Sequence, residues 1–236
     1  MLNTTPQEGS VIERPLTGST SRRKFLSTAG AAGLFSAFLL ADACKKTDNA
    51  PTATGATNVS LGSGDTGILN YAYALEQLEA AFYTQVVLTP YTGMSSVELT
   101  FLTDIRDHEI AHREFFKTAL STSAIAGLGV NFSTINFSDR TSVLATAKAF
   151  EDLGVSAYNG AGALISNADY LTLAGKIVSV EARHAALIRN LISYGSFSDS
   201  TVVDANGMEM SKTPSQVLAI AGAYVTTKID ASQLPG

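Results

Sequence analysis

The chain has 236 residues, of which 45% are hydrophobic and 16% are charged. That apolar content is enough for a sizeable core and lies outside the compositional range of disordered proteins. The formal net charge at pH 7 is −5, and no basic run occurs outside the first 50 residues. The sequence therefore lacks the cationic surface that nucleic-acid binding requires, and we expect one folded domain with attachments and no nucleic-acid partner.

Residues 1–43 have the features of an export signal. The run SRRKFL at residues 21–26 resembles the twin-arginine signature, and an apolar stretch diluted with Ser, Thr and Gly follows at residues 25–40. This stretch is shorter than the about 20 apolar residues that a membrane span needs. We expect a twin-arginine signal peptide, and an N-terminal anchor helix is the alternative.

A single cysteine, Cys44, follows the sequence Ala-Asp-Ala and precedes two lysines. The tract matches an A-x-A cleavage site and resembles the start of a bacterial lipoprotein, from which Asp42 departs. We expect lipidation of Cys44 as the only membrane attachment, in the periplasm or cell envelope. The alternative is a soluble exported protein with a free or removed cysteine. Residues 44–64, which are small and polar without periodicity, are predicted to be a flexible tether.

The folded part is predicted to begin with a helix of residues 65–87, capped by Asp65. Glu76, Glu79 and Tyr83 share one stripe of this helix, inside a face that also holds apolar residues. We therefore expect the two glutamates to point toward the core.

A second helix of residues 95–120 begins with the capping box Ser95-x-x-Glu98. Glu109 and His112 lie on its apolar stripe and form a Glu-x-x-His pair. The expected core face of this helix thus also carries a carboxylate, together with an imidazole.

Residues 121–136 are rich in Gly, Ser, Thr and Asn and are predicted to be a long connection. Such a segment reaches about 50 Å, which exceeds the roughly 36 Å length of a 24-residue helix. It can therefore cross a whole bundle. The helix that follows, residues 138–163 with a Ser138 cap, carries Glu151 and Tyr158 on one stripe.

The fourth predicted helix, residues 167–194, completes an internal repeat. It carries Glu181 and His184 as a second Glu-x-x-His, and the segment LEQLEAAFY at residues 75–83 returns as FEDLGVSAY at residues 150–158. The order Glu, Glu-x-x-His, Glu, Glu-x-x-His on four helices is what a bundle uses to build a two-metal carboxylate site.

Charge balance favours metal binding at these positions. Four buried carboxylates would be strongly destabilising at neutral pH unless they were compensated, and two divalent cations would supply four positive charges. Carboxylates with one imidazole per metal suit iron or manganese better than zinc or copper. Glu79 is a possible additional ligand. Because its counterpart in the repeat is Gly154, the site would have this extra carboxylate on one side only. It would suit a more oxidised pair, or else be protonated or solvated.

Residues 65–194 resemble the ferritin-like superfamily, and most closely the ferritin-like group of bacterial exported and desiccation-associated proteins. Glu76 followed seven residues later by Tyr83 is the first-helix pattern of ferritins, bacterioferritins and rubrerythrins. The resemblance implies an all-α four-helix bundle with a long crossover between helices 2 and 3. The ligands that it implies are Glu76 and Glu151 as terminal carboxylates, Glu109 and Glu181 as bridges, and His112 and His184 as one imidazole for each metal.

We expect redox handling of oxygen or peroxide by a pair of iron or manganese ions. A stress-related binding or structural protein that turns nothing over is the alternative, and whether the protein is an enzyme stays open, as does its oligomeric state. Tyr83 and Tyr158 are expected either as core aromatics or as hydrogen-bond partners of ligand carboxylates.

Residues 108–112 also match H-E-x-x-H, in which a zinc ion takes both histidines and Glu109 acts as general base in peptide hydrolysis. That interpretation leaves the second Glu-x-x-His and the repeat unexplained, so it is a minor alternative. In the two-metal interpretation, His108 is a neighbouring or surface group.

The last segment, residues 196–236, is predicted to be an extension of the bundle that occupies residues 65–195. A small hairpin around Asn206-Gly207 and a short helix from Pro214 to about Thr226 are expected within it.

Overall fold

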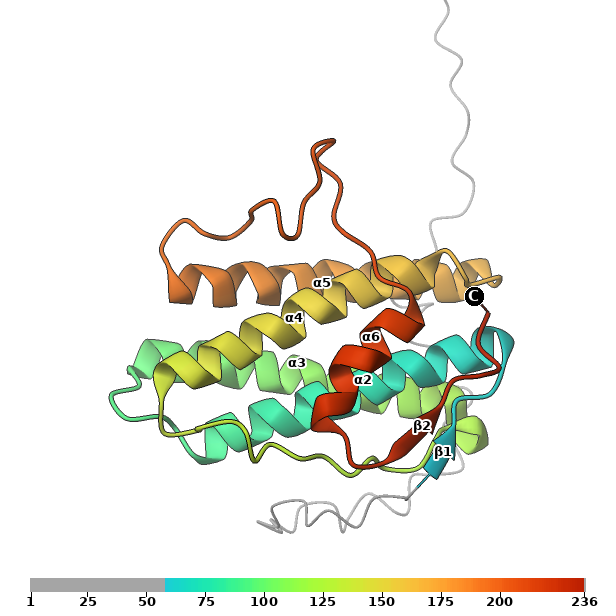
Figure 1. Ribbon diagram of the computed structural model, residues 1–236, viewed down its shortest axis with the longest axis horizontal. Helices are drawn as coiled ribbons and strands as arrows, with labels where there is room; N and C mark the ends of the chain where they lie inside the picture. Colours follow the sequence, from blue (N-terminus) through green and yellow to red (C-terminus); the bar gives the residue numbers. More distant parts are fainter. Residues whose placement is uncertain (1–57, 236) are drawn as a thin grey trace, which may run out of the picture. The chain divides into compact units, whose positions relative to one another are not determined.

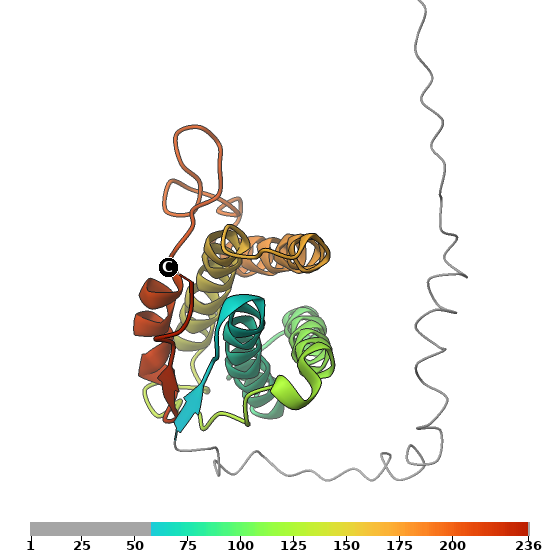
Figure 2. The same cartoon turned by 90° about the vertical axis from the view of Figure 1, so that its right-hand side faces the viewer.

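Four long helices build the domain in the computed structural model, which describes residues 58–235 (Figure 1). They are α2 (Gly64–Leu88), α3 (Ser96–Leu120), α4 (Arg140–Gly162) and α5 (Ala168–Ile192). α2 packs against α3, α4 packs against α5, and the two pairs meet through α2 and α4. Figure 2 shows these pairs end on, as two layers. The shorter elements are β1 (Asn58–Ser60), η2 (Ser121–Ser123), α6 (Pro214–Ala221), η3 (Gly222–Tyr224) and β2 (Lys228–Asp230). The predicted all-α four-helix bundle is confirmed.

Capping side chains explain where two of the helices begin. At the start of α3, Ser95 accepts a hydrogen bond from the backbone N–H of Glu98, whose carboxylate accepts one from Ser95 N–H, so the predicted capping box forms. α4 is capped by Asp139 rather than by the expected Ser138. The Asp139 carboxylate accepts hydrogen bonds from two N–H groups of the first turn, which a single hydroxyl could not match as well.

Asp65 does not cap α2, contrary to expectation. The capping position belongs to Ser63, which makes no side-chain hydrogen bond to the helix. The Asp65 carboxylate instead accepts hydrogen bonds from the backbone N–H groups of Ser166 and Asn167, both at 2.8 Å. Asn167 is itself the cap of α5. Asp65 therefore ties the first turn of α2 to the connection between α4 and α5.

The connection between α3 and α4 is the long crossover that the sequence predicted. It runs beside α2 and is held there by two polar side chains of that helix. Asn70 donates a hydrogen bond to the carbonyl oxygen of Ser123 at 2.9 Å and accepts one from Ile125 N–H at 3.0 Å. Gln77 accepts one from Leu128 N–H at 2.9 Å. These bonds satisfy backbone groups that the irregular crossover would otherwise leave unpaired.

The two ends of the described chain pair with each other. β1 and β2 form a parallel two-stranded sheet in which Val59 lies opposite Ile229. Val59 and Leu61 are buried, so the last residues of the predicted tether 44–64 belong to the domain. The rest of that tether, the predicted signal peptide 1–43 and Cys44 lie outside the described residues. Within residues 58–235, no helix has the length and apolar character of a membrane span.

The C-terminal extension packs along α4. Its helix α6 contacts α4 and begins with Pro214, as expected, but ends at Ala221 and continues as η3. The predicted hairpin consists of one antiparallel bridge between Val203 and Glu209, with Gly207 in the left-handed region at φ 77°. A short bridge also joins the extension to the crossover.

A buried arginine of α5 holds the extension in place. Arg189 is 2% exposed and donates hydrogen bonds to both carboxylate oxygens of Asp152 on α4, at 2.8 and 2.7 Å. It also donates to Asp199 at 2.9 Å and to Thr201 at 3.0 Å in the extension. A buried guanidinium is tolerated when planar carboxylates satisfy its donors in this way. The network therefore fixes α4, α5 and the extension to one another.

Candidate metal centre

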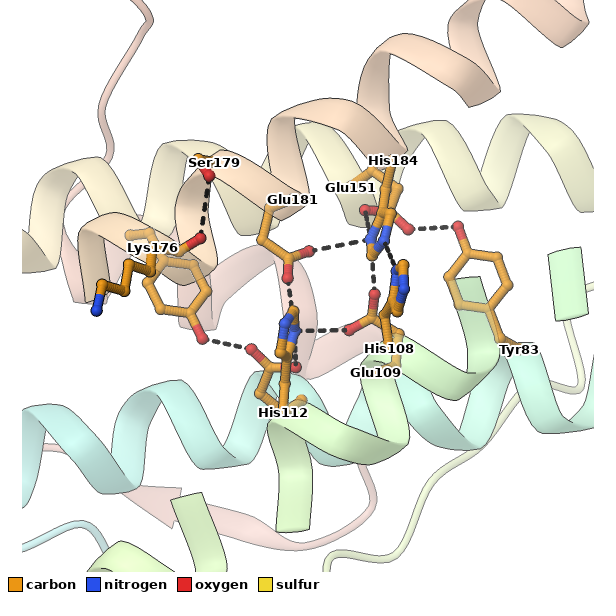
Figure 3. A network of polar contacts seen from close by, with 11 residues as sticks. Tyr83, His108, Glu109, His112, Glu151, Lys176, Ser179, Glu181 and His184 are labelled. Carbon is orange, nitrogen blue, oxygen red and sulfur yellow. Dashed lines mark hydrogen bonds and ion pairs between the residues drawn. The ribbon is translucent and has the colours of Figure 1, made fainter. Parts of the chain in front are cut away.

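The six side chains predicted as metal ligands converge in the middle of the bundle (Figure 3). Each long helix contributes one glutamate, and α3 and α5 each add a histidine one turn further on. These residues are Glu76 on α2, Glu109 and His112 on α3, Glu151 on α4, and Glu181 and His184 on α5. All four glutamates are 0% exposed. The helical period explains this convergence, because each ligand lies on the apolar stripe that faces the core.

The donor atoms form two overlapping groups. The first consists of Glu76, Glu109, His112 and Glu181, and the second of Glu109, Glu151, Glu181 and His184. Within each group the donor atoms lie within 4.8 Å of one another. Glu109 and Glu181 belong to both groups, and Figure 3 shows them between the two histidines. Each group therefore has one carboxylate of its own, one imidazole and two shared carboxylates.

The two histidines have similar surroundings. His112 Nδ1 lies 2.9 Å from Glu181 and 3.5 Å from Glu76. His184 Nδ1 lies 2.9 Å from Glu109 and 3.5 Å from Glu151. In both cases the nearer carboxylate is shared and the farther one is not. The internal repeat of the sequence thus appears in the structure as two matching halves of one site.

The close contacts between these residues are not aligned as hydrogen bonds. Eight nitrogen and oxygen atoms of the six residues are buried without any hydrogen-bond partner. Native proteins leave few buried polar atoms unpaired, and a cluster of them calls for an additional partner such as an ion. Carboxylate oxygens and imidazole nitrogens are donors for a transition metal. The residues present therefore fit a pair of metal ions.

Two tyrosines fix the carboxylates that the groups do not share. Tyr83 on α2 donates a hydrogen bond to Glu151 on α4 at 2.5 Å, and Tyr158 on α4 donates one to Glu76 on α2. Each tyrosine is buried and acts on the glutamate of the other helix. Each of the two hydroxyl groups therefore orients one candidate ligand, in addition to the packing of its ring.

Burial and mutual repulsion make this cluster of acids hard to ionise without cations. Burial raises the pKa of Glu151 to about 7 and that of Glu109 well above its usual range, where the charge of Glu181 adds to the effect. Burial alone would lower the pKa of His184, but its contacts with Glu109, Glu151 and Glu181 raise it to about 12. For the same reasons the pKa of His112 rises to about 9. The site thus strongly favours positive charge at both histidines.

Glu181 is the acid that benefits most from these histidines. Burial would raise the pKa of its carboxyl group, yet the close contacts with His112 and His184 hold it below its ordinary value. This carboxylate is therefore charged at neutral pH and lies between the two positions that attract cations.

Glu79 is a fifth buried carboxylate, but it belongs to neither donor group. It is 4% exposed and, among the described residues, makes no hydrogen bond or ion pair. Burial and the neighbouring glutamates raise its pKa well above the usual range. The carboxylate lies against Gly154, where an added Cβ would be 3.1 Å from a Glu79 oxygen. The glycine of the repeat therefore makes room for the extra glutamate.

His108 also lies outside both groups. Its Nδ1 is 2.9 Å from Nε2 of His184, whereas Nδ1 of that ring contacts the carboxylates. The described donors thus do not bring His108 and His112 to one metal, as a zinc hydrolase of the H-E-x-x-H type requires. The contact joins residues 76 positions apart on different helices, and sequence periodicity gave no signal for it.

Comparison with known proteins identifies the helical domain. A model of the ferritin-like domain family matches residues 64–194, which include all four long helices and all six candidate ligands. A search of curated proteins found no match to the chain. The family match covers more than half of the sequence. The chain therefore belongs to the ferritin-like domain family.

Proposed function

We propose that the bundle binds two iron or manganese ions in a carboxylate-bridged centre. The observation that carries this proposal is the cluster of eight buried and unpartnered donor atoms in two overlapping groups. One ion would be held by Glu76 and His112, the other by Glu151 and His184, and both by Glu109 and Glu181. Carboxylate-rich donor sets with a single imidazole per ion favour iron or manganese over the softer metals.

The charges support the same conclusion. Four buried glutamates carry four negative charges when ionised, and two divalent cations would balance them. Without cations, the acids must take up protons or be compensated by protonated histidines, as the raised pKa values of Glu109 and His184 indicate. Metal binding would release these protons, so affinity should rise with pH.

The chemistry that such a metal pair supplies is electron transfer to a small oxidant, oxygen or peroxide. The chain's own residues prepare the site for it. Tyr83 and Tyr158 hold the two unshared carboxylates, and their phenol protons stay in place because burial and the nearby glutamates raise the pKa of each well above its usual range. Phe116, one turn after His112, stacks its ring on that of Tyr158, and Phe116 and Ile177 both belong to the buried core. A bundle that binds metal in stress protection without turnover remains the alternative function.

Metal analysis tests the proposal directly. The protein is purified with iron, manganese and zinc all available, and metal per chain is measured before a peroxide-consumption assay. We expect two iron or manganese ions per chain, and we expect Glu181→Ala to empty the site because it removes a shared ligand. Retention of a single zinc by Glu181→Ala would instead favour the hydrolase, and peroxide consumption separates the redox protein from the non-catalytic alternative.

We also propose that the protein is exported and anchored. The run at residues 21–26 and the small residues before Cys44 support this part of the proposal. Cys44→Ala should release the protein from membranes if the cysteine is lipidated. An unchanged distribution between membrane and soluble fractions would contradict the anchor.

A further inference from the structure

His108, the first histidine of the H-E-x-x-H motif, contacts the candidate ligand His184 at Nε2, the ring nitrogen that does not contact the carboxylates. His108 Nδ1 and His184 Nε2 are 2.9 Å apart, and the two ring planes lie within 14° of each other. His108 is exposed on α3, whereas His184 is buried on α5. Figure 3 shows the His108 ring beside the His184 ring, and Nδ1 of His184 contacts the Glu109 and Glu151 carboxylates.

In the metal-bound form, this hydrogen bond would dictate which nitrogen of each ring carries a proton. His184 Nδ1 faces the carboxylates Glu109 and Glu151, so it is the nitrogen available to a metal ion. A neutral imidazole that binds metal through Nδ1 carries its proton on Nε2. That proton can be donated only to Nδ1 of His108, which must then accept it and keep its own proton on Nε2. One contact therefore fixes both tautomers.

We propose that His108 is a positioning residue for the metal ion held by His184, an inference that rests on the two-metal function proposed above. By accepting the Nε2 proton of His184, it holds the ring in the orientation that presents Nδ1 to the metal. A hydrogen-bonded imidazole is also a more basic ligand. The ion on this side is consequently bound more tightly than the unsupported ligand set would bind it.

The other half of the site lacks this support. Within residues 58–235, Nε2 of His112 makes no hydrogen bond to another side chain or to the backbone. In the internal repeat, His108 precedes Glu109, and the equivalent residue before Glu181 is Val180. Valine can neither donate nor accept a hydrogen bond. The two metal positions have matching ligands, but only the histidine ligand His184 has a hydrogen-bond partner at Nε2 among the described residues.

This difference gives the two positions unequal affinities. Loss of such an outer hydrogen bond typically weakens metal binding by about 10- to 100-fold. The ion on the His184 side should therefore bind first, and the ion on the His112 side should follow at higher metal concentration.

A titration of the metal-free protein with manganese(II), monitored by calorimetry and by electron paramagnetic resonance, tests the order of binding. His108→Val copies the residue that the repeat has at Val180, and His108→Asn places a carbonyl oxygen near the position of the lost acceptor. We expect two unequal binding steps in the unmodified protein. His108→Val should weaken the tighter step by about 10- to 100-fold and leave the other unchanged. His108→Asn should restore most of the loss.

Each other outcome overturns the inference. Equal weakening of both steps by His108→Val would indicate a general structural effect, and no weakening, or no restoration by His108→Asn, would exclude the acceptor role. Because His108 is exposed, both variants should keep the melting temperature of the metal-free protein. If the unmodified protein binds two manganese ions per chain and the His108 variants bind them with unchanged affinity, only the positioning role of His108 is refuted. No manganese binding by the unmodified protein would refute the proposed function as well.

Discussion

Replacement of Glu79 by glutamine should stabilise the metal-free protein. Glu79 is 4% exposed and has no hydrogen-bond or ion-pair partner among the described residues. Burial and four neighbouring glutamates raise its pKa well above 4.5, so folding at neutral pH forces this carboxyl group to take up a proton. Glutamine has nearly the same shape and needs no proton. The variant should therefore fold without that cost.

The size of the effect is limited by the pH. A buried carboxyl group can fold in its neutral, protonated form. The free energy of protonating it rises by about 1.36 kcal/mol for each pH unit above its ordinary pKa. Between an ordinary pKa of 4.5 and pH 7, the cost of protonating Glu79 is therefore at most about 3.4 kcal/mol. For a domain of this size, that corresponds to a rise in melting temperature of roughly 10 °C. The gain should shrink as the pH falls and vanish near pH 4.5.

Circular dichroism at 222 nm measures this effect after metal removal by a chelator, at several values of pH between 4.5 and 7. Glu181→Gln is the matched control, because contacts with His112 and His184 keep the pKa of Glu181 below its ordinary value despite burial. That substitution should destabilise the same metal-free protein at pH 7. A Glu79→Gln variant that melts at or below the unmodified protein at pH 7 would refute the assignment of Glu79 as an uncompensated buried acid.

Other predictions concern pH, the extension and export. Because the folded-state pKa of His112 is about 9, the folded protein binds more protons than the unfolded chain between pH 6.5 and 9, and the metal-free protein should lose stability over that range; denaturant titrations check this. Gly160→Ala should lower the stability of the fold by roughly 1 to 3 kcal/mol without loss of metal. Its Cβ would lie 1.9 Å from the Lys212 carbonyl oxygen, so Lys212 would move and its N–H would lose the hydrogen bond to the Ser156 carbonyl oxygen. Thermal melts and metal analysis check this. Replacing Arg22 and Arg23 by Lys should leave the precursor inside the cell, which fractionation with immunoblotting measures. A normal amount of exported protein would contradict the export signal.

Helical periodicity carried most of the prediction that the structure confirms. The apolar stripes predicted the positions of all four long helices, and the glutamates and histidines on them come together because the stripes face one core. The capping box at Ser95 was visible because its two partners are three residues apart. Local patterns of this kind need no knowledge of the tertiary structure.

Features that depend on contacts distant in the sequence could not be predicted in this way. Asp65 was expected to act within its own helix, but its partners lie near Asn167, about 100 residues away along the chain. β1 and β2 are three residues each, too short for an alternating pattern to be recognised. The ion pairs of Arg189 and the contact of His108 also arise only once separate helices have packed. In each case the sequence shows the residue but not its partner.

The distribution of the candidate ligands over the chain would make each bound metal ion a crosslink. α2 and α3 precede the crossover, and α4 and α5 follow it. The first donor group takes three residues from the early pair and Glu181 from the late pair, whereas the second takes three from the late pair and Glu109 from the early pair. Neither ion could be fully bound until both pairs have docked, and the pairs could not separate without breaking bonds to both ions. Two ions would thus serve as reversible staples across the middle of the fold, so that metal release, rather than the opening of any single helix, would control how fast the loaded protein unfolds.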